Sequence, residues 1–299
     1  MVGADRAGQR VSASSAPARA RPVLMGVLNL TPDSFSDGGR YLEPGPAVEH
    51  ALRLCAEGAD WIDVGGESTR PGARAVPVEE QLRRVVPVVR RLSRETNAVI
   101  SIDTTSAAVA ARAIDAGARV VNDVSGLSDS ELAPLVARSG VDLVVMHARG
   151  TPEVMQRDTA YADLVGEVVA HLALRVAAAR DAGVPPERIL VDPGLGFGKA
   201  PLDNPRLVAA LPRLRATGHR VLIGGSRKAF VGQLTGVERA SDRVCGSVGV
   251  ALAAALLGAH VLRVHDVKAT ADALATFLAC VPESGVGWWA EDDRVGAIR

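Results

Sequence analysis

Three polar side chains close short apolar runs of this sequence: Asp103, Asn122 and Asp192. Each follows a run of Val, Ile or Leu that is typical of a buried strand. Carboxylate and amide groups can together bind a flat heterocycle, because they accept from its N–H donors and donate to its acceptors. A single such residue is more often a turn former or helix cap, so the inference depends on several of these strand ends meeting at one place.

A second set of residues suits an anionic group. Arg263 and His265 end another apolar run, Asn29 ends the first one, and Arg70 lies in a long loop. Guanidinium forks and an imidazole suit a phosphate. Asn29 with nearby Asp33 can hold Mg2+ beside that phosphate, because this ion prefers oxygen ligands. The sequence shows no His and Cys cluster with zinc spacing, and no Ser, His and Asp set that stands out as a nucleophile.

Two long loops rich in Gly, Pro and Ser border these residues, at 31–39 and 65–72. One interpretation is a plain surface connection. We favour a pair of mobile lids over the site, because loops at the carboxyl ends of barrel strands commonly carry function.

These residues need a scaffold, and the hydrophobic pattern predicts one. Short β-branched runs alternate with Ala-, Leu- and Arg-rich stretches of helical period. The predicted strands are 23–29, 61–65, 99–103, 120–123, 143–147, 189–192, 221–225 and 261–265. The predicted helices are 45–58, 78–95, 106–117, 129–139, 160–183, 203–217, 240–258 and 269–281. Glycines typical of a helix C-cap stand at Gly58, Gly117, Gly183, Gly218 and Gly258.

This alternation of strands and helices predicts a (β/α)8 barrel, an α/β fold with eight parallel strands. The strands are continuous apolar runs, as expected of parallel strands that are buried on both faces. A doubly wound open sheet is the alternative, but it normally has fewer strands and a glycine-rich first turn, which 29–34 does not provide. In a barrel all the polar strand ends meet on one face, where active sites form.

Composition limits the functional classes. Hydrophobic residues make up 47% and charged residues 23% of the 299 residues, as in ordinary globular proteins. Lys and Arg total 34, the same as Asp and Glu, so the basic excess of a nucleic-acid binder is missing. No apolar run reaches the roughly 18 residues of a membrane span. Cys55, Cys245 and Cys280 lie far apart in helical apolar patterns, and we expect them to be reduced and buried in a cytoplasmic protein.

We expect one domain over 21–282, with a further segment on each side. Residues 1–20 are rich in Ala, Arg, Ser and Gly without apolar periodicity, which predicts a disordered arm. Residues 283–299 form a tail that contains Trp288 and Trp289 and to which we assign no role.

Five segments are similar to the signature motifs of dihydropteroate synthases. They are 25–39 (MGVLNLTPDSFSDGG), 63–72 (DVGGESTRPG), 192–199 (DPGLGFGK), 225–228 (GSRK) and 263–266 (RVHD). The similarity extends from Pro22 to Cys280, with the motifs in the family's order. Departures are small: Leu30 stands where Val is usual, and Ala148 where a second Met often follows the histidine. Neither removes a polar contact.

The resemblance implies a (β/α)8 enzyme of folate biosynthesis that is usually a homodimer. Members of this family join 4-aminobenzoate to 6-hydroxymethyl-7,8-dihydropterin diphosphate and release pyrophosphate, with Mg2+ as cofactor. Sulfonamides compete for the 4-aminobenzoate site. The implied partners are these small molecules, with no nucleic acid and no membrane.

The resemblance also assigns roles by position. The pterin set is Asp103, Asn122, Val124, Met146, Asp192, Gly225 and Lys228. The diphosphate set is Asn29, Arg70, Arg263 and His265, with Asn29 nearest the metal. The aminobenzoate set is Thr69, Arg70, Pro71, Phe197, Ser226 and Lys228. The groups implied in catalysis are Asp103, Lys228, Arg263 and His265.

Two alternatives share part of this residue set. A methyltransferase that passes a methyl group from methyltetrahydrofolate to a corrinoid keeps the Asp and Asn residues that bind pterin, but needs neither both loop motifs nor the GSRK motif. A non-catalytic paralogue that binds pterin is expected to have lost Arg70, Lys228 or the pair Arg263 and His265. All four residues are present.

Overall fold

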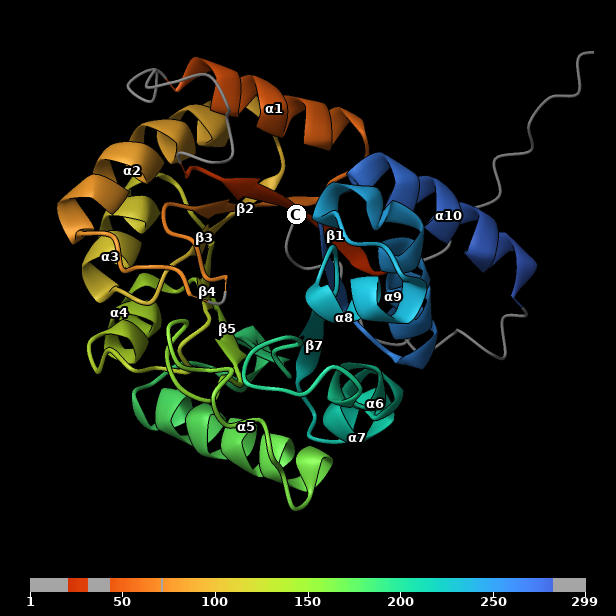
Figure 1. Ribbon diagram of the computed structural model, residues 1–299. Helices are drawn as coiled ribbons and strands as arrows, with labels where there is room; N and C mark the ends of the chain where they lie inside the picture. The colour runs from red at the N-terminus through yellow and green to blue at the C-terminus, as the bar shows by residue number, and fades with distance from the viewer. Residues whose placement is uncertain (1–20, 32–43, 71, 282–299) are drawn as a thin grey trace, which may run out of the picture.

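Eight parallel strands close into one barrel in the computed structural model, which describes residues 21–31, 44–70 and 72–281. Strand order follows chain order, and β8 (Val261–Val264) pairs with β1 (Val23–Asn29) to complete the sheet. Figure 1 shows the helices as a ring around these strands. The predicted (β/α)8 fold is therefore confirmed, and an open sheet is excluded.

The remaining elements alternate around the barrel. The other strands are β2 Trp61–Gly65, β3 Val99–Asp103, β4 Val120–Asp123, β5 Asp142–Met146, β6 Ile189–Asp192 and β7 Arg220–Ile223. The α-helices are α1 Gly45–Ala56, α2 Val78–Glu95, α3 Ala107–Ala116, α4 Leu132–Ser139, α5 Leu164–Asp181, α6 Asp203–Ala209, α7 Leu211–Arg215, α8 Ala229–Thr235, α9 Val244–Leu257 and α10 Val267–Cys280. Two short 3-10 helices are η2 Pro186–Arg188 and η3 Ala240–Asp242.

The element bounds differ from the predicted ones in a few places. β5, β7 and β8 each end before the predicted residue, so His147, Gly225 and His265 follow their strands. The helix predicted over 203–217 is split into α6 and α7, because Pro212 has no N–H to continue the hydrogen-bond ladder. Helix α8 was not predicted, since its seven residues are too few to show a helical period.

The predicted C-cap glycines are confirmed. All five adopt a left-handed backbone with φ between 80° and 118°, which side chains other than glycine rarely tolerate. The predicted arm at 1–20 and the tail at 283–299 lie outside the described residues. Within the ranges that the structure describes, no helix combines the length and the apolar character of a membrane span.

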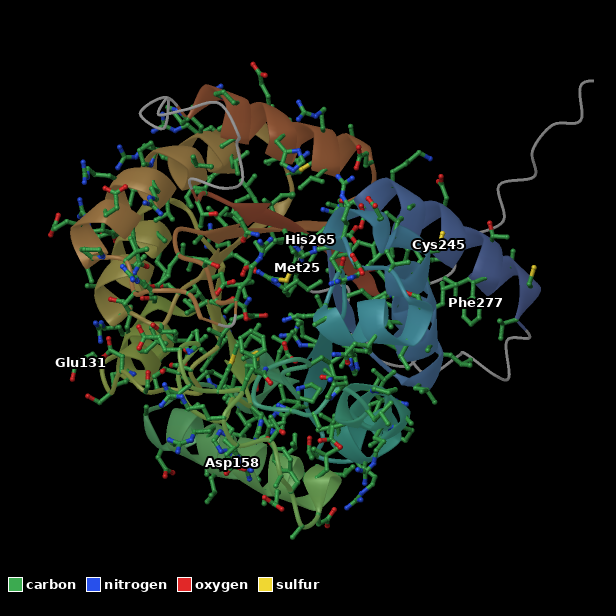
Figure 2. The ribbon with its side chains drawn as sticks, in the orientation of Figure 1. Met25, Glu131, Asp158, Cys245, His265 and Phe277 are labelled. Atoms are coloured by element: carbon green, nitrogen blue, oxygen red, sulfur yellow. The ribbon has the colours of Figure 1, made fainter. Side chains whose placement is uncertain are left out.

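The interior of the barrel is layered. Seven apolar side chains, one from each strand except β3, form its middle layer: Met25, Trp61, Val120, Val144, Leu190, Leu222 and Val261. Met25 lies near the centre of the ring of helices in Figure 2. Because side chains alternate along a strand, the next inward positions lie above and below this apolar layer. The layer therefore separates the polar groups at the two ends of the barrel.

A larger core of Leu, Val, Ile and Ala fills the space between strands and helices. The three cysteines are less buried than predicted. Cys55 is half-buried, whereas Cys245 and Cys280 are exposed. Cys245 is seen on α9 in Figure 2. The prediction that all three are buried is wrong, because a helix packed on a barrel buries only the side that faces the strands, even when every side of it is apolar.

The apolar layer should contribute strongly to stability. Replacing Leu222, which is fully buried, with Ala removes packed atoms and leaves a cavity, so we expect a loss of about 2–5 kcal/mol in the free energy of unfolding. Urea unfolding followed by circular dichroism measures this loss. Leu174→Ala is the matched control, since Leu174 is 70% exposed, and its effect should stay within about 0.5 kcal/mol. Equal effects of the two substitutions would contradict a packed layer.

Candidate active site

An arginine joins three strands above the apolar layer. Arg263 on β8 donates from Nε to Asp63 Oδ2 at 2.6 Å and from Nη2 to Asp103 Oδ2 at 2.8 Å. Asn122 Nδ2 on β4 also donates to Asp63 Oδ2, at 3.0 Å. Asp63 is fully buried. The sequence analysis did not identify Asp63 as a site residue. The signal was available, because Asp63 is two residues before Gly65 on the same strand and therefore points to the same, inward face.

Asp103 keeps an oxygen for a further partner. Its Oδ1 is buried and has no hydrogen-bond partner among the described residues, and the same is true of Asp63 Oδ1 and Ser101 Oγ. Burial raises the pKa of Asp103 to about 7; Arg263 opposes this rise and the like charge of Asp63 adds to it. Unpaired buried oxygens are costly unless a donor reaches them, so this end of the barrel is suited to a ligand that carries N–H groups.

Asn29 stands at the end of β1, next to this carboxylate. A Cβ atom added to Gly65 would lie 3.6 Å from both Asn29 Oδ1 and Asp103 Cβ, so the glycine separates the two side chains. Asp33, the second predicted Mg2+ ligand, lies outside the described residues. Within the described part of the chain, no group of three His, Cys, Asp or Glu residues could hold a metal. Asn29 offers a side-chain oxygen at this point, which is the kind of ligand that Mg2+ prefers.

Lys228 and Asp192 complete the polar group. Lys228 Nζ lies 4.2 Å from the centre of the Phe197 ring, and burial lowers the pKa of Lys228 to about 8. Asp192 Oδ1 accepts a hydrogen bond from Gly194 N at 2.7 Å, and burial raises the pKa of Asp192. The carboxylate thus caps the Pro193–Gly194 turn and also lies near Lys228, whose charge lowers its pKa. The structure brings together the polar residues predicted from β3, β4 and β6.

An apolar wall accompanies these groups. Val124, Met146 and Phe197, all predicted site residues, form one buried cluster with Met155, which the sequence did not single out. Gly225 is buried against α9, where an added Cβ would lie 2.6 Å from Val250 Cγ1. The absence of a side chain at this position is therefore required by packing.

His265 pairs with a serine. Ser226 Oγ accepts from His265 N at 3.1 Å and lies 3.1 Å from His265 Nδ1. Burial, with the charge of Arg263 beside it, lowers the pKa of His265 to about 3. The imidazole is neutral at neutral pH, so Arg263 supplies the positive charge at this point and His265 supplies hydrogen bonding. Ser226, which the resemblance assigned to the aminobenzoate set, lies beside the diphosphate set.

The loop after β2 carries two further predicted residues. Thr69 is half-buried and Arg70 is exposed, while Pro71 lies outside the described residues. The positive charge of Arg70 lowers the pKa of both Lys228 and His265. The base of the loop is fixed, because Glu67 Oε1 accepts from Val76 N at 2.6 Å. The other predicted lid, 31–39, lies outside the described residues from Pro32 onward.

Polar residues beside the inward ones face away from the barrel mouth. Asp123 follows Asn122, and its carboxylate accepts from Ser125 N at 2.8 Å and from Ser125 Oγ at 2.6 Å, which makes it a loop cap. Neighbouring strand residues point to opposite faces, so only one of each pair can reach the site. Asp123 therefore belongs to the loop after β4 and not to the candidate site.

His147 is a second polar residue that follows an inward one. It follows Met146 and lies against His171, with a centroid distance of 4.7 Å. Lys199, which is 3% exposed, donates to Phe197 O at 2.9 Å and to His147 O at 3.3 Å, and its Nζ lies 2.9 Å from His147 Nδ1. Burial lowers the pKa of Lys199 to about 7 and that of His147 to about 3. The neutral imidazole accepts from the ammonium, which thereby ties the β6–α6 loop to β5.

The turn that carries Ser226 and Lys228 is fixed by an ion pair. Arg227 has a left-handed backbone with φ 59°, which is uncommon for a residue other than glycine. Its guanidinium binds Asp266 at two points, Nε to Oδ2 at 3.0 Å and Nη2 to Oδ1 at 2.5 Å. Arg243 Nη1 donates to Arg227 O at 3.0 Å. The strained turn is thus held from two sides, and it presents Ser226 and Lys228 to the site.

Known proteins share this sequence and fold. A family described as pterin binding enzyme matches residues 25–265. The dihydropteroate synthase of Mycobacterium leprae is 49% identical over 258 residues, which cover 84% of this chain and 90% of that protein. The chain belongs to the dihydropteroate synthase family of pterin-binding enzymes. The family resemblance seen in the five sequence motifs is therefore confirmed.

Two solved structures of this family, both from Xanthomonas albilineans, are closely similar to the barrel. Dihydropteroate synthase with 4-aminobenzoic acid matches with a TM-score of 0.83 and 50% identity, covering 88% of this chain and 94% of that one. The same enzyme in complex with 7,8-dihydropteroate matches with a TM-score of 0.79 and 46% identity, covering 88% and 95%. Identity at this level extends over the whole barrel rather than over the motifs alone.

Lys199 should control the order of the loop that carries Phe197. Lys199→Met keeps the length of the side chain but leaves the carbonyl groups of His147 and Phe197 without their donor. We expect amide hydrogen exchange at 194–198 to become about tenfold faster or more, since each lost bond is worth about 1 kcal/mol. Lys268→Met is the control, because Lys268 is exposed and pairs with Asp272 at the surface, away from this loop. Unchanged exchange in Lys199→Met would contradict this role.

Proposed function

We propose that the chain acts as a dihydropteroate synthase, which condenses 6-hydroxymethyl-7,8-dihydropterin diphosphate with 4-aminobenzoate and releases 7,8-dihydropteroate and pyrophosphate. The observation that carries the proposal is the polar layer in which Arg263 binds Asp63 and Asp103 beside Asn122. Known family members support the same reaction, since their structures contain 4-aminobenzoic acid and 7,8-dihydropteroate.

The pterin ring fits the buried acceptors. A dihydropterin offers the N3–H and the 2-amino group as neighbouring donors, which a carboxylate accepts in pairs. Asp192 and Asp103 are the carboxylates, and Asn122 can both accept and donate. Val124 and Met146 supply apolar contact for the flat ring.

The diphosphate belongs at the ends of β8 and β1. Arg263 provides a guanidinium that Asp63 and Asp103 hold in place, and His265 adds a neutral hydrogen-bonding group. Asn29 would provide an oxygen ligand to Mg2+, alongside oxygens of the substrate. When bound, this ion neutralises charge that develops on the leaving group.

Bond formation needs positioning and electrostatic stabilisation more than a nucleophilic side chain. The amine of 4-aminobenzoate attacks the methylene carbon of the pterin, the carbon–oxygen bond to diphosphate breaks, and the amine loses a proton. Arg263 stabilises the departing diphosphate, and the carboxylate of Asp103 stabilises positive charge on the pterin methylene. Lys228 and Phe197 lie together on the side assigned to 4-aminobenzoate. A sulfonamide that copies this substrate would compete there.

We also propose a homodimer in the cytoplasm. Helix α9 is apolar on all sides, and Leu256 on it and Leu234 on α8 are 42% and 56% exposed. Exposed apolar side chains on neighbouring helices support a surface between two copies of the chain. Three cysteines without a disulfide among the described residues support a reducing compartment.

A pyrophosphate-release assay tests the activity. With both substrates and Mg2+, we expect pyrophosphate and dihydropteroate in equal amounts, and no release when 4-aminobenzoate is left out. Asp192→Asn should remain folded but bind the pterin roughly 10- to 100-fold more weakly, because an NH2 group then faces a donor at about 1–3 kcal/mol per unpaired group. Asp123→Asn is the control, since Asp123 caps a loop and faces away from the site. Pterin binding without pyrophosphate release would instead indicate a non-catalytic paralogue.

The reaction should have a narrow pH range. Asp103 must be ionised to accept from the pterin, and its pKa is about 7, so kcat/KM for the pterin diphosphate should rise with pH through about 7. Lys228 loses its charge above its pKa of about 8, so kcat/KM should fall there. Lys228→Arg should remove the alkaline fall, because the guanidinium stays charged. An acidic limb centred near pH 4 would show that Asp103 does not control the profile.

A further inference from the structure

The barrel has a cavity at the end opposite to the candidate active site. It has a volume of about 850 Å3 and lies among the N-terminal ends of β3 to β7. The charged side chains that line it are Arg119, Arg188, Arg220, Asp142 and Glu187. The apolar layer that contains Trp61 and Leu222 lies between this cavity and the candidate active site. We call it the basal pocket.

Arg220 is the buried member of this group. It is the first residue of β7 and is 6% exposed. Both of its hydrogen bonds use Nη2, to Asp142 Oδ2 at 2.7 Å and to Glu187 O at 3.0 Å. Its Nε is buried with no hydrogen-bond partner in the described structure. A buried guanidinium therefore contributes to the wall of the pocket while part of its donor capacity is unused.

Arg119 and Arg188 add two further charges. Arg119 immediately precedes β4, and Arg188 ends η2 immediately before β6. Neither forms an ion pair with any residue that the structure describes, in contrast to Arg220. A Cβ added to Gly140 would lie 2.8 Å from Arg188 Nη1, so the guanidinium of Arg188 packs over the glycine at the wall of the pocket. The absence of a side chain at Gly140 leaves room for this arrangement.

The balance of charge in the basal pocket is positive. Three arginines face two acidic residues, and Arg220 already occupies the carboxylate of Asp142. Glu187 is exposed, and the neutral part of the wall includes Ser93 and Thr96, whose hydroxyl groups already donate to Ala116 O and Cys55 Sγ. The arginines are therefore the main donors for a ligand in this pocket. Guanidinium groups from separate elements that surround one cavity are suited to several oxygens of one anion.

We propose that the basal pocket binds a small multivalent oxyanion, a tricarboxylate or a phosphate, through Arg119, Arg188 and Arg220. This site is separate from the diphosphate subsite, since the apolar layer lies between Arg220 and Arg263. The amino ends of barrel strands rarely carry chemistry, so the site binds and does not catalyse. The inference does not depend on the proposed synthase reaction.

Calorimetric titration of the whole chain with citrate and, separately, with inorganic phosphate tests this site. We compare the unaltered protein with the double variant Arg119→Gln and Arg188→Gln. We expect at least tenfold weaker binding in the double variant. The anion that binds more tightly identifies the class, carboxylate or phosphate. The matched control is Arg90→Gln with Arg138→Gln, which removes two exposed arginines that do not line the pocket and should leave binding unchanged.

A second arm separates the basal pocket from the active site. Arg263→Gln should weaken pyrophosphate binding and leave binding of the basal anion unchanged. The Arg119 and Arg188 double variant should still bind pyrophosphate, and this binding also shows that the variant is folded. The proposal is overturned if neither anion binds at concentrations up to about 10 mM. It is also overturned if the bound anion is lost in Arg263→Gln and retained in the double variant. A failure of pyrophosphate release in the unaltered protein concerns the synthase reaction alone.

Discussion

The pairing of Arg263 with two buried carboxylates is the interaction on which the rest of the site depends. It links β8 to β2 and β3 across the mouth of the barrel. Charged groups are costly to bury. Removing one partner of a buried ion pair typically lowers the free energy of unfolding by about 3–5 kcal/mol. One guanidinium cannot neutralise Asp63 and Asp103 fully, and the pKa of Asp103 of about 7 reflects burial with this incomplete compensation. The site is therefore preformed, and it retains acceptor capacity for a ligand with N–H donors.

The position of this cluster follows from the layers of the barrel. Met25 and Trp61 belong to the apolar layer. Every inward residue above this layer must pair its polar atoms with other polar groups or with a ligand. The apolar layer also separates Arg220 and Asp142 from Arg263 and its two carboxylates. A barrel with few aromatic residues thus keeps two polar regions apart by packing aliphatic side chains around a single tryptophan.

Residues that point away from the mouth hold the loops that carry the site. Lys199 and His147 fix the loop with Phe197, Asp266 and Arg243 fix the turn with Lys228, and Asp123 caps the loop after β4. These contacts pair polar groups that are buried or partly buried, and they are rigid because leaving such a group unpaired is costly. Positioning of the reacting groups therefore depends on a second set of side chains that does not touch the pterin pocket.

The sequence alone determined the barrel, because period, glycine caps and β-branched runs are local signals, and five of the eight strands have the predicted bounds. It also identified Asp103, Asn122, Asp192 and Arg263, since each stands at a strand end within a specific motif. Only the tertiary structure decided which of two adjacent polar residues faces inward, as with Asn122 and Asp123. It also decided the partners of Asp63 and Lys199, and the neutral state of His265. These depend on contacts between distant segments and on burial, which no local pattern encodes.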